Sequence, residues 1–191
     1  MGEYYPGYVF HDGDDYPDIA AWCNANGCYI KEITPDAEGR RFEIVEIPPK
    51  SLDEAKADKI AELNAAKNKQ LDTGGLEYEE DLFAYDDKAL LRISGTILDW
   101  QDQISRGTVQ PEDIVQPWIS KANRVHALSY DQLIELARLL RQEVQRIVFY
   151  GTYLEKLAQA ATSLEELDAI VWDYGAASAS GIIDRLIAGG N

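Results

Sequence analysis

The pattern of hydrophobic and polar positions over the first 49 residues predicts a small α/β unit. Residues 29–33 and 41–47 alternate with a period of two, as half-buried strands do, and a hairpin-like turn segment separates them. An aromatic segment at residues 4–10 predicts a further short strand. Pro17 opens a short apolar helix that Asn26-Gly27 would end. We therefore expect residues 1–49 to form a small head domain.

Residues 50–72 predict a helix with a narrow apolar stripe. Ser51 and Glu54 have the spacing of a capping box, which favours a helix start at this point. Because the stripe is narrow, the helix would bury little area by itself, and we expect it to lie in a groove or to associate with copies of itself. We interpret this segment as a helical linker whose apolar positions Leu52, Ile60 and Leu63 contact other protein.

Residues 73–174 predict a mainly helical body with two small hairpins. Two short strands are expected within 76–85, and a second hairpin within 118–128. Asp86 or Asp87 would begin a helix that runs to about Ile104, and Ser129 with Gln132 would begin a longer one that runs to about Ala160. The fold class that this pattern predicts is α+β, a β-rich head followed by a mainly α-helical body with short β-hairpins.

The end of the chain is ambiguous. Ser163 predicts the start of a helix that reaches Trp172 or Tyr174, and residues 175–180 have a flexible composition. We treat residues 175–191 as a C-terminal extension. Its apolar cluster either folds back on the core or docks on a partner, and it consists of Ile182, Ile183, Leu186 and Ile187.

Composition restricts the partners of this chain of 191 residues. Its formal net charge is −16, and a surface of that sign repels phosphate backbones and anionic lipid, so nucleic acid is an unlikely partner. Two stretches, 1–50 and 73–113, carry 20 of the 34 acidic residues. No apolar run is longer than the five residues 19–23, whereas a membrane span needs about 20. Together with the N-terminal sequence, this pattern predicts a soluble protein made in a cytoplasm.

Candidate catalytic groups are few. His11 and His126 lie in no known nucleophile pattern. Cys23 and Cys28 lack the second pair of ligands that a zinc site needs, so we expect them to be buried thiols. Acidic residues in two turn segments, 11–15 and 79–81, are better explained by solvation than by metal binding or acid–base chemistry. We therefore predict no catalytic residue, no metal, no cofactor and no enzymatic activity. Four tryptophans and eleven tyrosines instead favour a protein-binding role.

The order of several motifs resembles a known family. The motifs are the linker 48–56, the helix segment 59–67, Gly75-Leu76-Glu77-Tyr78, Leu82-Phe83-Ala84-Tyr85-Asp86, Trp118 with Asn123, Leu128-Ser129 and the segment 160–170. In this order they look like a domain of unknown function common in bacteriophage tail and tail-fibre gene modules. The resemblance covers about residues 27–172, and residues 27–49 resemble the short β-rich head that often precedes this domain.

The resemblance implies a structural protein of the bacteriophage tail, at a tail tip, baseplate or fibre attachment, with other tail or fibre proteins as partners. A tail-fibre assembly chaperone and a host-receptor-binding fibre component are the alternatives, and an envelope hydrolase would need carboxylates or a metal set that converge in a cleft. The implied location is the virion tail, after synthesis in the host bacterial cytoplasm. The narrow stripe of the 50–72 helix further predicts a homo-oligomer, with a trimer favoured.

Overall fold

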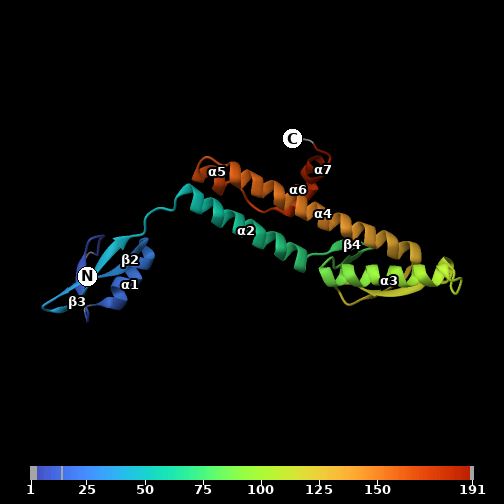
Figure 1. Ribbon diagram of the computed structural model, residues 1–191, viewed down its shortest axis with the longest axis horizontal. Helices are drawn as coiled ribbons and strands as arrows, with labels where there is room; N and C mark the ends of the chain where they lie inside the picture. The colour runs from blue at the N-terminus through green and yellow to red at the C-terminus, as the bar shows by residue number, and fades with distance from the viewer. Residues whose placement is uncertain (1–3, 14, 190–191) are drawn as a thin grey trace. The chain divides into compact units, whose positions relative to one another are not determined.

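The computed structural model describes residues 4–13 and 15–189, which form two compact units, Met1–Ser51 and Leu52–Asn191 (Figure 1). Each unit has its own hydrophobic core. Helices account for 55% of the structure and strands for 19%, gathered in small sheets, which confirms the α+β class. None of the helices within the described residues is both long and apolar enough to cross a membrane.

The first unit is a three-stranded antiparallel sheet with one helix. In chain order its elements are β1 (Val9–His11), α1 (Tyr16–Ala25), β2 (Cys28–Asp36) and β3 (Gly39–Glu46). The strands lie in the order β1-β3-β2, with Ile44 opposite Ile30 and Phe42 opposite Phe10. Alternate residues of the sheet and the apolar side of α1 form the core, which contains Phe10, Ile19, Cys23, Cys28, Phe42 and Ile44.

The first strand is shorter than the aromatic pattern predicts. Tyr8 N–H donates to the Tyr5 carbonyl at 3.0 Å, and Gly7 has a φ of 90°, so residues 5–8 form a turn before β1 begins. The predicted end of α1 is confirmed, because Gly27 takes the left-handed conformation with φ 65°.

Three long helices form the frame of the second unit: α2 (Leu52–Thr73), α3 (Asp87–Ser105) and α4 (Tyr130–Ala160). Lys56 Nζ donates to the Gln159 carbonyl at 2.9 Å, and Arg141 donates to Ser94 Oγ at 2.9 Å. These contacts show that α2 and α3 run one after the other along α4, both antiparallel to it (Figure 1). The 31 residues of α4 give it a length of about 45 Å, enough to support both helices.

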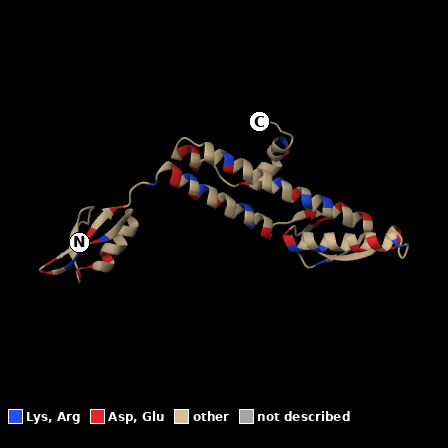
Figure 2. Cartoon of the chain, in the orientation of Figure 1, with Lys and Arg blue, Asp and Glu red and all other residues tan. Residues whose placement is uncertain are grey.

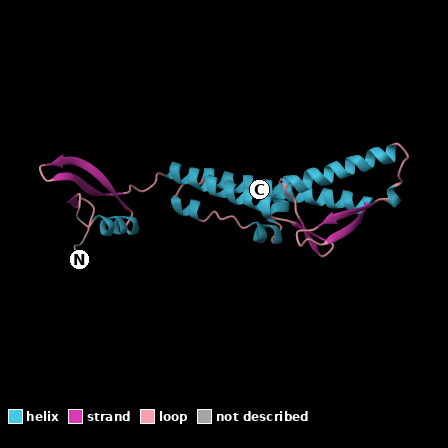
Figure 3. Cartoon of the chain, turned by 90° about the horizontal axis from the view of Figure 1, so that it is seen from below, coloured by secondary structure: helices cyan, strands magenta, loops and turns pink. Residues whose placement is uncertain are grey.

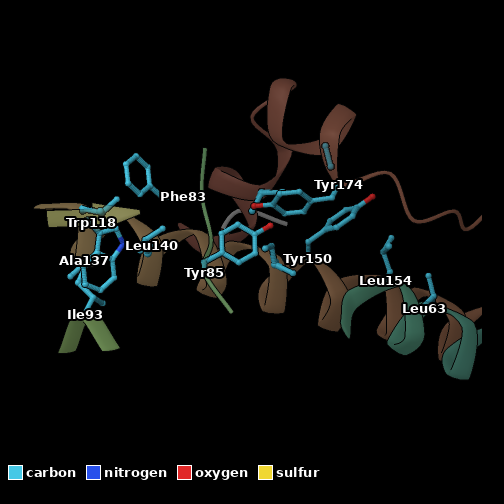
Figure 4. Close-up of a cluster of buried hydrophobic side chains, with 14 of the residues drawn as sticks. Leu63, Phe83, Tyr85, Ile93, Trp118, Ala137, Leu140, Tyr150, Leu154 and Tyr174 are labelled. Carbon is cyan, nitrogen blue, oxygen red and sulfur yellow. The ribbon is translucent and has the colours of Figure 1, made fainter. Parts of the chain in front are cut away.

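The predicted hairpins are present between these helices (Figure 3). β4 (Leu76–Tyr78) pairs with β5 (Asp81–Phe83), and β6 (Val115–Ile119) pairs with β7 (Val125–Ser129) after a 3₁₀ turn at Pro111–Asp113. The predicted capping box of α4 is confirmed, because Ser129 Oγ accepts from Gln132 N–H while Gln132 Oε1 accepts from Ser129 N–H. One core joins the hairpins to the helices, and part of it is shown in Figure 4.

The helix α2 differs from the predicted linker. Leu63 is only 1% exposed and lies in the core of the second unit (Figure 4). Ile60 packs against the same core. Lys67 Nζ also forms an ion pair with Glu155 of α4 at 2.9 Å. The narrow stripe of α2 is therefore covered within the same chain by α4. The reason is that α4 is long enough to offer α2 a complete second surface.

The C-terminal part also differs from expectation. α5 (Leu164–Asp168) ends before the predicted Trp172. The stretch 175–180, which was expected to be flexible, lies mostly in α6 (Tyr174–Ala179), and α7 (Ile182–Ile187) follows it. Trp172 packs on Tyr150 of α4, with ring centroids 5.3 Å apart. Asp173 caps α6 by accepting from Ala176 N–H at 2.9 Å. Burial of aromatic side chains against α4 thus orders a segment whose composition alone favours flexibility.

Candidate protein-binding surfaces

A buried and multiply hydrogen-bonded carboxylate of the second unit is that of Asp81, at the start of β5. Its side chain is 4% exposed, and its carboxylate accepts from Arg124 Nε at 2.8 Å and lies 2.8 Å from His126 Nε2. Leu82 N–H donates to the same carboxylate at 2.8 Å. Hydrogen bonds, first from Arg124 and then from Ser120, hold the pKa of Asp81 well below its usual range, against the opposing effect of burial.

This cluster joins the two hairpins of the second unit. Asp81 belongs to β5, whereas Ser120, Arg124 and His126 belong to β7 and the turn that precedes it. The prediction that the acidic residues 79–81 are solvated is wrong for Asp81. Its neighbours in space supply the hydrogen bonds that water would otherwise make. A carboxylate, a histidine and a serine are therefore close together. Ser120 bonds to Asp81 and is buried, so the arrangement does not present a serine nucleophile to a substrate.

The other predicted chemical candidates lie in the first unit. His11 Nε2 lies 3.2 Å from the Asp36 carboxylate at an exposed site. Cys23 and Cys28 are buried free thiols, as the sequence predicts. Burial, followed by the neighbouring Cys28, raises the pKa of Cys23, which makes that thiol less reactive. Within residues 4–13 and 15–189, no group of three His, Cys, Asp or Glu side chains is arranged to hold a metal ion.

A groove of about 750 Å³ lies between α3 and α4. Its lining residues follow a helical spacing on both helices, so one face of each helix forms one wall. They are Ser94, Ile97, Leu98 and Gln101 of α3, with Ile134, Ala137, Arg138, Arg141, Gln142 and Gln145 of α4. Leu98 is 65% exposed and Ile134 is 38% exposed. The groove therefore offers an apolar surface, with amide and guanidinium groups beside it, to another molecule.

The charges of the groove differ from those of the whole chain. None of its described lining residues carries a carboxylate, although acidic residues outnumber basic ones along the chain and are spread over its helices (Figure 2). Arg141 donates to Ser94, which is neutral, and Arg138 forms two hydrogen bonds with Glu135 on the same helix at 2.6 and 2.8 Å. The bond from Arg138 lowers the pKa of Glu135. Among the residues that the structure describes, no carboxylate forms an ion pair with Arg141, so its positive charge remains available in the groove.

A second surface, the outer face of the β6–β7 hairpin, was not found from the sequence. Three cross-strand pairs form it, and all six residues are exposed: Val115 with Ser129, Pro117 with Ala127, and Ile119 with Val125. The alternation of residues 118–128 predicts the hairpin. It does not say which face is covered, because the inner face carries Gln116 and His126 as well as Trp118 and Leu128.

The predicted interface residues do not come together on one surface. Leu63 and Ile183 are buried in the core and are not available to a partner, because α4 covers both α2 and α7. Leu52, Ile60 and Leu186 are partly buried, and Ile182 and Ile187 are exposed on α7. The C-terminal cluster therefore folds back on the core, which was one of the two alternatives.

The C-terminal segment is held on α4 by polar as well as apolar contacts. Tyr174 Oη donates to Glu143 at 2.8 Å, and Arg146 pairs with Asp184 of α7 and donates to Ser178 of α6. Burial and then the bond to Glu143 raise the pKa of Tyr174 well above its usual value. Tyr174 also packs on Tyr150 (Figure 4).

Comparison with known proteins identifies the second unit. No curated protein and no solved structure matches the chain. The family model of a "Domain of unknown function (DUF4376)" matches residues 54–175, from the first turn of α2 to the start of α6. This match covers more than half of the chain and confirms its resemblance to a domain of unknown function. The chain therefore belongs to the DUF4376 family, with a separate α/β unit before the matched region.

Proposed function

We propose that this protein is a structural component of a bacteriophage tail, at a tail tip, baseplate or fibre attachment, and that it works through protein–protein contacts. The observation that carries the protein-binding part is the open groove between α3 and α4. The tail part rests on the order of motifs along the chain, which resembles that of tail and tail-fibre module proteins.

The groove supports a docking role because its apolar side chains face solvent. Leu98 and Ile134 lie on the two walls, and burial of such side chains by a partner contributes about 25 cal/mol per Å² of apolar area. Residues 134–145 rise about 16 Å along α4, which matches about three turns of a partner helix. An amphipathic helix of another tail or fibre protein is the partner that this shape favours.

Self-association is also part of the proposal. The expected contact between copies through α2 is not available, because Leu63 is buried against α4. We keep the homo-oligomer and place its contacts on another surface. The trimer that was favoured rested on the stripe of α2 and loses its support because α4 covers that stripe. The proposed location is the virion tail, after synthesis in the host bacterial cytoplasm, and nucleic acid is not a proposed partner.

Mass spectrometry of purified particles tests the tail role. We expect the chain at a fixed ratio to known tail proteins in particles of the phage that encodes it. If the chain is present only in the lysate of infected cells and is absent from particles, it is an assembly chaperone and the structural role is wrong.

A matched pair of substitutions tests the groove. We expect Leu98→Asp to reduce incorporation into particles by about tenfold or more, because a charge on the groove wall opposes apolar docking. Leu164→Asp is the control, since Leu164 is also exposed but lies on α5 outside the groove. Equal incorporation of both variants, each folded as judged by circular dichroism, would contradict docking through the groove.

A further inference from the structure

We infer that the outer face of the β6–β7 hairpin is the surface through which copies of this chain associate, with the face of one copy packed on the same face of a second. This inference rests on the proposed self-association and is independent of the tail role. It is carried by the composition of the face, by the way its register is determined, and by the charges at its two ends.

The outer face departs from the usual pattern of a half-exposed sheet. In an antiparallel sheet with one face in water, apolar side chains point to the core and polar ones to solvent. Here the exposed face contains three large apolar side chains, Val115, Ile119 and Val125, which are 61%, 58% and 68% exposed. The remaining positions of the face are Pro117, Ala127 and Ser129. This face is apolar and carries no charged side chain, so it is available for contact with another protein surface.

The inner face of the hairpin determines this orientation. Trp118 and Leu128 are buried in the core, Gln116 accepts from Trp100 Nε1 at 3.2 Å, and His126 contacts Asp81. A shift of the strands by one residue would expose these four side chains and break both polar contacts. The apolar outer face is therefore a stable feature of the fold.

The occupant that fits best is a second copy, for two electrostatic reasons. A chain of charge −16 repels another copy, and an uncharged face is where two copies approach at the lowest Coulomb cost. The two ends of the hairpin also carry opposite charges. Glu112 and Asp113 are exposed just before β6, and Lys121 is exposed in the turn after it.

Lys121 Nζ donates to the neutral carbonyls of Thr73 and Gly74 rather than to a carboxylate. In a two-fold contact with antiparallel hairpins, the turn of each hairpin lies over the open end of the other. Each Lys121 then approaches the acidic end of the partner copy, twice per dimer.

The size of the face predicts a weak association. Five residues along two strands cover roughly 17 by 10 Å, which is well below the area of about 800 Å² per partner in stable complexes. We therefore expect dissociation in the micromolar range or weaker, and an assembly whose mass depends on protein concentration.

Light scattering and sedimentation equilibrium of the full chain, from micromolar to millimolar concentration, test the inference. We expect the wild-type mass to rise from 21.4 kDa toward twice that value. Val125→Asp should raise the dissociation constant by about 100-fold, because a two-fold contact contains the substitution twice. Val171→Asp is the matched control, since Val171 is 63% exposed outside the hairpin, and it should leave the assembly unchanged.

Two further variants separate a lost contact from a lost fold. Val125→Thr keeps a β-branched residue in the strand and should weaken association less than Val125→Asp does. The double variant Glu112→Lys with Asp113→Lys leaves the face intact and should weaken association by removing the charge pairing with Lys121. Circular dichroism and tryptophan fluorescence of each variant should match the wild-type protein.

The outcomes separate the two proposals. A wild-type mass that stays at 21.4 kDa at every concentration overturns self-association as a whole. If neither Val125→Asp nor Val125→Thr weakens the oligomer, the protein self-associates through another surface. The assignment of the contact to the β6–β7 face is then wrong. Neither result changes the particle measurement that tests the tail role.

Discussion

Gly74 and Gly95 should respond in opposite ways to the same substitution. A Cβ on Gly74 would collide with the Tyr85 side chain and lie 2.5 Å from the Gln70 carbonyl, whereas a Cβ on Gly95 meets nothing within 4 Å. We expect Gly74→Ala to lower the free energy of unfolding of the second unit by about 1–3 kcal/mol. Gly95→Ala should raise it by about 0.5–1 kcal/mol, because alanine favours the interior of α3.

Urea unfolding followed by circular dichroism measures both effects. Gly95→Ala also serves as the control for Gly74→Ala, because both variants add the same single methyl group. A Gly74→Ala variant as stable as the wild type would show that Tyr85 and α2 move apart without cost, which would contradict the tight contact.

Asp81 should make the second unit sensitive to acid. Its pKa is lowered in the folded state, first by Arg124, so its ionised form stabilises the fold above the ordinary carboxylate pKa of about 4. This stabilisation is lost as the pH falls below that value, because the unfolded chain then binds a proton that the folded chain does not. We expect Asp81→Asn to lower the urea midpoint of unfolding at pH 7. The difference in urea midpoint between this variant and the wild type should become smaller at pH 3.

Glu77→Gln is the control for this pH dependence, because Glu77 is an exposed carboxylate in the strand paired with β5. Its urea midpoint should follow that of the wild type at both pH values. A gap between Asp81→Asn and the wild type that stays constant from pH 7 to pH 3 would be inconsistent with an ionised Asp81 in the folded state.

At the scale of elements, α7 tests whether the C-terminal segment belongs to the core. Ile183 has 0% exposure and Ile187 has 43%, although both are isoleucines on the same short helix. We expect Ile183→Ala to cost about 2–4 kcal/mol of unfolding free energy and Ile187→Ala less than about 1 kcal/mol. Urea unfolding measures both, and equal small effects would mean that α7 does not pack on α4 in solution.

The elements differ in how well the sequence predicts them. α3 and α4 follow from local signals, since Asp86 and Ser129 cap their first turns and the apolar spacing continues for many residues. The two hairpins follow from short alternating strands and turn residues. α6 is missed because all but the first of its residues are small and show no apolar periodicity. The one available signal was Asp173, which caps the first turn.

At the scale of the whole molecule, the two units should unfold separately, because each has its own core. We expect two thermal transitions. Phe42→Ala should destabilise only the first unit and Leu140→Ala only the second, so each should lower the midpoint temperature of one transition. Because both side chains are buried, each substitution should cost about 3 kcal/mol or more of unfolding free energy. Calorimetry distinguishes them, and one transition shifted by either substitution would contradict independent units.

The sequence by itself determined the order and type of nearly all elements and the α+β class. It also determined the buried thiols and the resemblance to a family of unknown function. These features depend on local signals, on side-chain periodicity or on the order of motifs along the chain. The tertiary structure alone decided which apolar positions are covered. Leu63 and Ile183 are buried because α4 passes beside them, while Leu98 and Val125 are left open because nothing within the described residues covers them.

The same distinction holds for the polar groups. Asp81 lies in an acidic turn like several others in this chain, and only the approach of Arg124, 43 residues away, makes it a buried, bonded carboxylate. Local sequence determines what an element is, because its backbone hydrogen bonds and caps are local. Partners distant in sequence determine what each of its faces does, because burial is a property of the packed chain.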